Sequence, residues 1–192
     1  MSKNVIIVGA GIGGLATALR LVKSGYKVKI LEKNSQAGGR LNRISRDGFS
    51  FDTGPSFFSM SYEFENFAKD CRIRIPFKYS PLEPLYTVNI INNAKTFFIY
   101  KNVRKLSEQF NDIEPNFEIK MMKYLNKTEK VFNDTVDLVI KRNFDSIFSY
   151  LISLMQVNPI HLPLLLKSFW KEVTNNFSSR EARQIISLVA FF

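Results

Sequence analysis

Several residue types that carry chemistry are scarce in this 192-residue sequence, which has one cysteine, one histidine and one tryptophan. A single cysteine, Cys71, excludes an intramolecular disulfide and a cysteine-based zinc site. It also favours a reducing compartment. We therefore expect no metal centre.

Long runs of one charge are missing as well. The formal net charge is +10, but no block of five or six like charges forms a basic tail, and the signatures of RNA-binding modules are not found. Nucleic acid is therefore not expected as a partner. The charge indicates either a solvated lysine-rich surface or an anionic partner, such as phospholipid headgroups or cofactor phosphates. Because no signal-peptide core precedes the first predicted strand, we expect a cytoplasmic protein, peripheral to the membrane if it is attached to one.

Phenylalanine, in contrast, is abundant. Eighteen Phe residues are present, and hydrophobic residues make up 45% of the sequence, which is ordinary for a globular protein with a buried core. So many Phe residues indicate a Phe-rich core, or else an apolar cavity or a membrane-facing surface.

The first third of the sequence has the pattern of a β-α-β unit. Residues 5–8 (VIIV) form a continuous apolar run, as expected for a parallel strand buried on both faces. A helix with apolar residues at helical spacing follows, and Gly25 is placed for a left-handed helix end. Residues 27–32 (KVKILE) predict a second strand. Two parallel strands joined through a helix begin a doubly wound sheet.

The turn between the first strand and the helix has the sequence Gly9-Ala10-Gly11-Ile12-Gly13-Gly14, which matches the pattern GxGxxG. In this pattern the first glycine permits a tight turn, the second lets a pyrophosphate approach the backbone, and the last lets the helix pack closely on the sheet. The N–H groups at the helix start face the phosphates. Glu32 closes the second strand, where a carboxylate accepts hydrogen bonds from the adenosine ribose and disfavours the 2′-phosphate of NADP.

NAD and FAD both bind to such a unit, and the residues that follow favour FAD. Residues 36–40 (QAGGR) place a second glycine pair near the pyrophosphate, and Arg40 carries a guanidinium suited to phosphate oxygens. The stretch from Val5 to Arg43 resembles the FAD-binding segment of the amine oxidase and phytoene desaturase superfamily. The resemblance implies FAD as the cofactor.

Residues 48–56 (GFSFDTGPS) indicate which family within this superfamily the sequence resembles. They are similar to the GF-x-FD-x-GPS element of bacterial-type phytoene desaturases, which implies that residues 54–56 lie near the flavin ring; the alternative is an ordinary strand-ending turn. Residues 83–86 and 179–184 resemble the substrate domain of that family more loosely. The residues expected to contact FAD are Gly9, Ala10, Gly11, Ile12, Gly13, Gly14, Glu32, Lys33, Gly38, Gly39, Arg40, Leu41, Gly54, Pro55 and Ser56.

The rest of the sequence predicts a mostly helical part. Two β-rich runs, 85–91 and 96–100, flank Asn92-Asn93 and predict a hairpin. After Pro115 an apolar stripe predicts a long amphipathic helix. Its members are Phe117, Met121, Leu125, Thr128, Phe132, Val136 and Val139.

Residues 146–166 contain no Asp, Glu, Lys or Arg. A run of this length is nominally long enough to span a bilayer, but Pro159 and Pro163 interrupt it. We predict two shorter helices, either buried in the core or lying at a membrane interface.

The fold class expected from these features is α/β. An incomplete Rossmann-like FAD-binding βαβ domain occupies residues 1–75. A β-hairpin and a mainly helical, incomplete substrate and membrane-associating domain occupy residues 76–192.

By the resemblance, the protein is an FAD-dependent oxidoreductase that desaturates a hydrophobic polyene, such as phytoene or a hydroxylated carotenoid. Family members are longer, so the fragment alone is expected to be inactive. Two alternatives are amine or porphyrinogen oxidation by the same fold and a non-catalytic flavin-binding fragment. No catalytic residue is indicated: we interpret His161 as structural, Cys71 as a free thiol and not a flavin tether, and Asp52 as structural.

Overall fold

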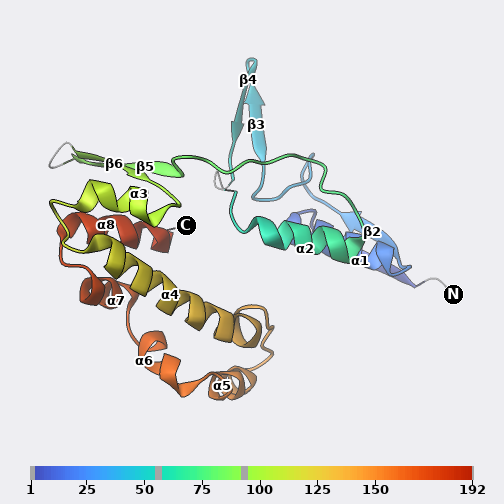
Figure 1. Cartoon of the computed structure of the whole chain (residues 1–192). Coiled ribbons are helices and arrows are strands. Elements are labelled where there is room, and N and C mark those ends of the chain that lie inside the picture. Colours follow the sequence, from blue (N-terminus) through green and yellow to red (C-terminus); the bar gives the residue numbers. More distant parts are fainter. Residues whose placement is uncertain (1–2, 55–57, 92–94, 192) are drawn as a thin grey trace. The chain divides into compact units, whose positions relative to one another are not determined.

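The computed structural model describes residues 3–54, 58–91 and 95–191, and the chain divides into two compact units (Figure 1). Unit 1 comprises Met1–Tyr79 and unit 2 comprises Ser80–Phe192. The sequence predicted a boundary after residue 75; the roles assigned there to the two parts stay predictions. No helix in the described ranges combines the length and the hydropathy needed to cross a membrane.

Unit 1 begins with the predicted β-α-β unit. Strand β1 (Asn4–Val8) and strand β2 (Lys27–Leu31) are parallel, with Val5 opposite Val28, and helix α1 (Ile12–Lys23) connects them. Gly25 ends the helix with φ +86°, and its N–H donates to the carbonyl of Val22 at 3.0 Å. The left-handed helix end predicted at Gly25 is therefore confirmed, and it turns the chain back toward β2.

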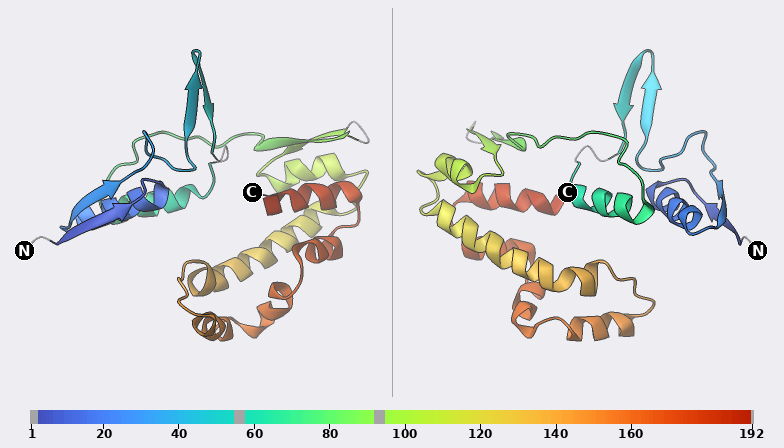
Figure 2. Two further views of the ribbon diagram at one scale, coloured as in Figure 1. Left: turned by 180° about the vertical axis from the view of Figure 1, so that it is seen from behind. Right: turned by 45° about the vertical axis from the view of Figure 1, so that its right-hand side comes forward.

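The remainder of unit 1 is an antiparallel hairpin and a second helix. Strand β3 (Arg43–Arg46) pairs with β4 (Phe49–Asp52), and every residue of both strands is exposed. Helix α2 (Ser61–Cys71) runs alongside α1 (Figure 2). Arg20 of α1 joins the two helices, because its guanidinium lies 3.0 Å from the carboxylate of Asp70 and stacks over the ring of Phe67.

The burial expected for β1 is wrong. Val8 is 85% exposed and Ile6 is also exposed, whereas Val5 and Ile7 are half-buried. The reason is the size of the sheet: among the described residues it contains only β1 and β2. The face of β1 that carries Ile6 and Val8 is therefore exposed. The apolar run 5–8 predicted a strand buried on both faces, but only one face is covered.

Unit 2 combines a hairpin with a set of helices. Strand β5 (Tyr86–Ile90) pairs antiparallel with β6 (Lys95–Ile99), as predicted, although the expected turn at Asn92-Asn93 lies outside the described residues. The helical elements are α3 (Val103–Ser107), η2 (Glu108–Phe110), α4 (Phe117–Thr135), the π-helical turn η3 (Val136–Ile140), α5 (Ile147–Met155), η4 (Pro159–His161), α6 (Leu162–Leu165), α7 (Phe169–Asn176), α8 (Arg180–Ser187) and η5 (Leu188–Phe191).

Phenylalanine side chains form the centre of unit 2. Phe110 and Phe117 stack with ring centroids 4.0 Å apart, and Phe97 and Phe177 contact this pair from β6 and from the end of α7. Such aromatic pairs contribute about 0.5–1.5 kcal/mol beyond their buried area. The predicted Phe-rich core is therefore present and contains these four residues, whereas other phenylalanines, such as Phe49 and Phe148, are exposed.

The buried face of α4 differs in part from the predicted stripe. Phe117 and Met121 are buried as expected, but Leu125 and Phe132 are exposed, and Tyr124 is buried in their place. The Tyr124 ring contacts that of Phe177 edge-on, with centroids 5.7 Å apart. The side of α4 that is buried is therefore the side that α7 packs against, and it is not the side with the most apolar residues.

A buried carboxylate fastens the start of α8 to the rest of this core. The side chain of Glu114 is fully buried, accepts hydrogen bonds from the backbone N–H groups of Ser178 and Ser179 at 2.8 and 2.6 Å, and pairs with Lys120. Burial acts to raise the pKa of Glu114, but Lys120 and the two N–H donors outweigh it and hold the pKa below its ordinary value. Glu114 is therefore ionised at neutral pH.

Residues 146–166 form the two short helices predicted, α5 and α6. Of the two alternatives left open for these helices, burial in the core is wrong, because Met155 is 85% and Leu166 is 84% exposed. Only Ser153 and Val157 of this segment are buried. The uncharged segment therefore presents apolar side chains on the surface of unit 2.

Candidate dinucleotide site

The glycine-rich turn joins β1 to α1 with a very close backbone approach. Gly9 has φ +98°, a conformation that side chains disfavour, and its N–H donates to the carbonyl of Leu31 at 2.7 Å. A Cβ atom added at Gly14 would lie 2.2 Å from the carbonyl oxygen of Gly9. Only glycine at position 14 therefore lets the first turn of α1 pack directly on the end of the strand.

The first turn of α1 points uncompensated N–H groups at open space. The helix begins at Ile12, its N-cap is Gly11 without a side-chain hydrogen bond, and its first turn contains no acidic residue. A Cβ atom added at Gly11 or at Gly13 would meet nothing within 4 Å. The positive end of the helix dipole is thus accessible to an anion at close range.

The second glycine pair lies directly against the first turn. The N–H of Gly38 donates to the carbonyl of Ala10 at 2.8 Å, and Gly38 forms a parallel bridge with Gly11. A Cβ atom added at Gly39 would lie 3.1 Å from the Cα atom of Gly11. Segments far apart in the sequence therefore form one continuous glycine-lined wall.

The end of β4 closes the other side of the site. A Cβ atom added at Gly54 would lie 2.5 Å from the carbonyl oxygen of Arg40. The backbone N–H and the hydroxyl of Thr53 both donate to the carbonyl of Asn42, at 2.8 and 3.0 Å. Sequence reasoning missed Asn42 and Thr53; their place between the QAGGR and GPS motifs is the signal that could have found them.

These segments enclose a cavity of about 910 Å³. Eight predicted contact residues line it, together with Asn42 and Thr53. Five further predicted residues do not line the cavity, namely Gly9, Ala10, Gly14, Glu32 and the exposed Lys33. Pro55 and Ser56 lie outside the described residues. The lining residues are Gly11, Ile12, Gly13, Gly38, Gly39, Arg40, Leu41, Asn42, Thr53 and Gly54.

Glu32 is held by the backbone around the glycine turn. One carboxylate oxygen accepts from the N–H of Ala10 at 2.7 Å, and the other accepts from the N–H of Asn34 at 2.9 Å. These bonds, led by the one from Asn34, lower the pKa of Glu32 below its ordinary value. The ionised carboxylate has lone pairs left to accept hydrogen bonds from a ligand.

The cavity has the features that a dinucleotide diphosphate requires. Backbone without Cβ atoms allows close approach, the start of α1 supplies N–H donors, and Arg40 adds a guanidinium at the rim. An added side chain at Gly11 or Gly13 would project into the open space and fill it. The residues present therefore fit the diphosphate of FAD.

The remaining candidates take structural positions. Cys71 is a buried free thiol at the end of α2. His161 belongs to unit 2, where its Nε2 lies 2.6 Å from the carboxylate of Asp134. Asp52 is exposed at the end of β4 and lines a smaller cavity beside Asn42. None of the three lines the glycine-walled cavity.

Comparisons with known proteins agree with this geometry. Residues 7–72 match the family described as NAD(P)-binding Rossmann-like domain. The whole chain is 30% identical to a phytoene desaturase of Fusarium fujikuroi and covers 34% of that protein. The chain is therefore similar to about one third of a phytoene desaturase. A second similar protein is 4,4'-diaponeurosporene oxygenase of Staphylococcus aureus, 31% identical over 85% of the chain and 32% of the relative.

A solved structure extends the likeness to the fold. Putrescine oxidase superposes on the chain with a TM-score of 0.53 at 20% sequence identity, over 98% of the chain and 36% of the oxidase. The Rossmann-like α/β fold class is therefore confirmed. The chain spans about one third of the length of these curated relatives.

Proposed function

We propose that this chain provides the FAD-binding part of an FAD-dependent oxidoreductase that desaturates a carotenoid precursor, such as phytoene or a hydroxylated carotenoid. One observation carries the proposal: the glycine-walled cavity at the start of α1 occurs in a chain that is 30% identical to a phytoene desaturase along its entire length. The likeness to putrescine oxidase concerns the fold alone, so it does not favour an amine substrate.

Each part of the site has a defined task in holding the cofactor. The N–H groups at the start of α1 donate to the diphosphate, and Arg40 neutralises part of its charge. Glu32 accepts hydrogen bonds from the adenosine ribose hydroxyls while it continues to hold the Ala10 N–H. Gly54, which packs on the backbone of Arg40 and has no side chain, would let the flavin ring approach the backbone at the end of β4.

When bound, FAD supplies the hydride acceptor for removal of two hydrogens from the polyene. The chain contributes binding and orientation to this reaction. A polyene dissolved in lipid must be collected at a bilayer, so we also propose that the protein is cytoplasmic and attached peripherally to the membrane. The exposed uncharged segment of unit 2 supports this attachment.

Binding of FAD to the 192-residue chain tests the cofactor site. Titration of FAD followed by flavin fluorescence should show binding that the Arg40→Gln variant weakens about tenfold, because a charge-assisted hydrogen bond to phosphate is lost. Arg46→Gln, at the exposed tip of the β3–β4 hairpin, is the matched control and should leave the affinity unchanged. Equal affinity of both variants for FAD would show that Arg40 does not contribute to binding. Absence of any FAD binding would overturn the proposal.

The reaction itself is tested on the protein in its full natural length. Anaerobic addition of phytoene in vesicles should bleach the flavin absorption, whereas putrescine should not. Bleaching by an amine alone would establish amine oxidation in place of desaturation. A stable flavin spectrum with every substrate would favour a non-catalytic flavin-binding protein. We expect the 192-residue chain alone to bind FAD without turnover.

A further inference from the structure

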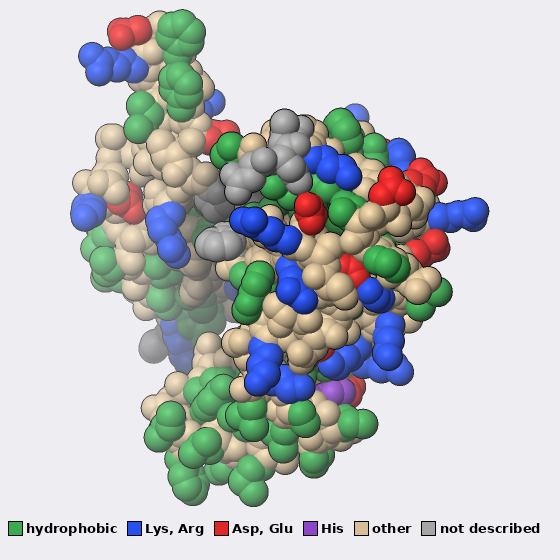
Figure 3. Space-filling view, turned by 90° about the vertical axis from the view of Figure 1, so that its left-hand side faces the viewer, with side chains coloured by type: hydrophobic (Ala, Val, Ile, Leu, Met, Phe, Trp, Pro, Cys, Tyr) green, Lys and Arg blue, Asp and Glu red, His purple; other side chains and the backbone are tan. Residues whose placement is uncertain are grey.

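An apolar surface segment of unit 2 lies beside a cluster of lysines. The segment, residues 146–166, contains α5, η4 and α6 and carries no Asp, Glu, Lys or Arg. Figure 3 shows hydrophobic side chains gathered at this end of unit 2, with Lys and Arg side chains and the histidine directly above them. The most exposed of these hydrophobic residues are Ile147, Phe148, Met155, Ile160 and Leu166.

The lysines and the apolar segment share one groove of about 620 Å³. Lys123, Lys127 and Lys130 line it from α4, where a spacing of three to four residues places them on one face of the helix. Ile160, together with His161 and Leu164, lines it from η4 and α6. We call this cavity the lysine groove. It opens where the charged surface of unit 2 meets the uncharged segment.

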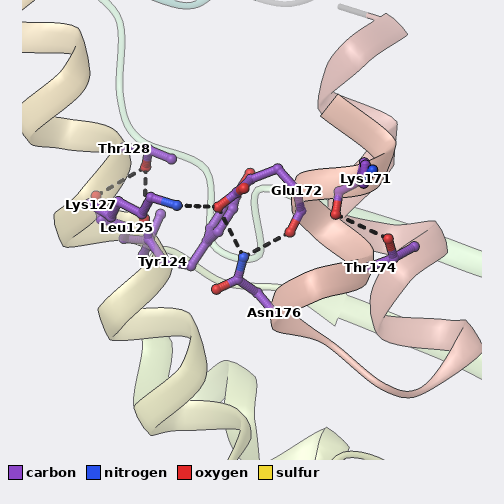
Figure 4. Close-up of polar contacts among 8 residues, drawn as sticks. All are labelled: Tyr124, Leu125, Lys127, Thr128, Lys171, Glu172, Thr174 and Asn176. Atoms are coloured by element: carbon purple, nitrogen blue, oxygen red, sulfur yellow. Dashed lines mark hydrogen bonds and ion pairs between the residues drawn. The ribbon is translucent and has the colours of Figure 1, made fainter. Parts of the chain in front are cut away.

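The three lysines differ in their acidic partners. Lys127 forms an ion pair with the buried Glu172, which also accepts a hydrogen bond from Asn176 (Figure 4). Within the described part of the chain, Lys123 and Lys130 form no ion pair, and no acidic side chain lines the groove. A second acid that contacts a groove residue, Asp134, is bonded to His161. The groove therefore retains positive charge that an anion can neutralise.

We propose that the lysine groove binds the phosphate of an anionic phospholipid, while the apolar segment 146–166 enters the acyl region of the same leaflet. The proposal rests on the peripheral attachment proposed above, and it assigns the lipid class and the residues that recognise it. A bilayer presents phosphates and hydrocarbon at adjacent depths, and Ile160 and Leu164 adjoin Lys123 and Lys130 in the same way. Nucleic acid would match the charge but would leave the apolar segment in water.

Vesicle flotation with the 192-residue chain tests this assignment. Wild type should bind vesicles of phosphatidylcholine mixed with phosphatidylglycerol more tightly than vesicles of phosphatidylcholine alone. Lys123→Gln/Lys130→Gln should weaken binding to the mixed vesicles roughly 25-fold, since each lysine near an anionic surface contributes about fivefold. Lys69→Gln/Lys101→Gln removes the same charge from exposed sites outside the groove and should change binding little.

Further measurements test the apolar segment and the phosphate site separately. Phe148→Ser/Met155→Ser should weaken binding to both kinds of vesicle, because it removes exposed apolar area and leaves the groove intact. Inorganic phosphate at matched ionic strength should not release the chain from the vesicles. Far-UV circular dichroism should show that every variant is folded, as expected for substitutions at exposed side chains.

Several results would overturn the assignment. Equal binding of the two lysine variants to mixed vesicles would show that the groove is not the headgroup site, but it would be compatible with peripheral attachment. Unchanged binding of the Phe148→Ser/Met155→Ser variant would exclude insertion of the segment. Release by inorganic phosphate would indicate a site for free phosphate, and retention on DNA without vesicle binding would indicate a nucleic acid partner. Absence of binding to every vesicle would reject both the headgroup site and peripheral attachment.

Discussion

In unit 2 Phe97, Phe110 and Phe177 are at most 1% exposed and belong to one core, whereas the described part of unit 1 buries only small side chains. The buried hydrophobic residues in the described part of unit 1 are Ala10, Ala18, Ala68 and Cys71. Unit 2 is therefore held by burial of large aromatic groups, while the candidate cofactor site of unit 1 is built by close backbone contacts at glycines. The two units should respond differently to substitution.

This difference follows from what each unit has to bind. A core of interlocking rings leaves no room for a ligand, and unit 2 presents its groove and its apolar segment on the surface. In unit 1 the turns at Gly9–Gly14 and Gly38–Gly39 keep backbone exposed around a cavity of about 910 Å³. A sheet of two strands is only marginally stable by itself. We therefore expect FAD to stabilise unit 1 and to leave unit 2 largely unaffected.

The largest effect is expected from truncating the core of unit 2. Phe177→Ala should lower the free energy of unfolding by about 3–5 kcal/mol, because a buried ring is removed and leaves a cavity. Urea unfolding followed by the fluorescence of Trp170, the only tryptophan, reports on this unit. Phe148→Ala in the same unit is the control: this residue is 71% exposed, so its loss should change stability by less than about 0.5 kcal/mol. Similar losses from both variants would contradict a unit 2 held together by its buried rings.

A smaller loss, with a distinct pH dependence, is expected at Glu114. Glu114→Gln should cost about 2–3 kcal/mol at neutral pH, because charge-assisted hydrogen bonds to Ser178, Ser179 and Lys120 are weakened. The folded state lowers the pKa of Glu114, so its stabilisation is complete above the ordinary value of 4.5 and is lost as the pH falls through the folded value.

The pH series supplies the check for this prediction. Wild-type stability measured by Trp170 fluorescence should fall below about pH 4.5, and the Glu114→Gln variant should show a flatter profile over the same interval. Glu118→Gln, at an exposed position in the first turn of α4, serves as the control and should keep the wild-type profile. Parallel profiles for Glu114→Gln and wild type would show that another group governs acid unfolding.

These examples mark what the sequence could predict. The β-α-β unit, the β5–β6 hairpin, the helix end at Gly25 and the glycine wall follow from local patterns, because φ angles, turns and strand periodicity depend on neighbouring residues. Glu114 could not be recognised in this way, since its partners Ser178 and Ser179 lie 64 and 65 residues further along the chain.

Burial was harder to predict for the same physical reason. The choice of Tyr124 over Leu125 for the core depends on where α7 packs, and hydropathy alone does not contain that information. The open face at Val8 and the exposed segment 146–166 are apolar runs that folding within this chain does not cover. Apolar sequence indicates a need for a partner surface, but the structure decides whether the chain itself provides one.

In unit 1 the sharpest test is at Gly14. Gly14→Ala should destabilise the contact between β1 and α1 by about 1–3 kcal/mol, because the added methyl group would lie 2.2 Å from the Gly9 carbonyl oxygen. Hydrogen exchange of the α1 amides should accelerate, and FAD affinity should fall, while the exchange of α4 and α8 stays unchanged. Gly13→Ala, where an added Cβ meets nothing within 4 Å, should leave amide exchange at its wild-type rate or slower. Equal exchange rates for the two variants would contradict the close packing.

The smallest effect is expected at the start of α8, where Ser179 is the N-cap and its hydroxyl oxygen accepts from the N–H of Ala182 at 3.3 Å. Ser179→Ala should cost about 1 kcal/mol, the usual contribution of such a cap, and Ser178→Ala, which removes no capping bond, should cost less than about 0.5 kcal/mol. The Ser179 hydroxyl also helps to lower the pKa of Glu114, so its loss should raise that pKa and shift acid unfolding to higher pH. Trp170 fluorescence measures both effects. A stability loss without the pH shift would limit the role of Ser179 to capping, and equal losses for the two serines would contradict the assigned cap.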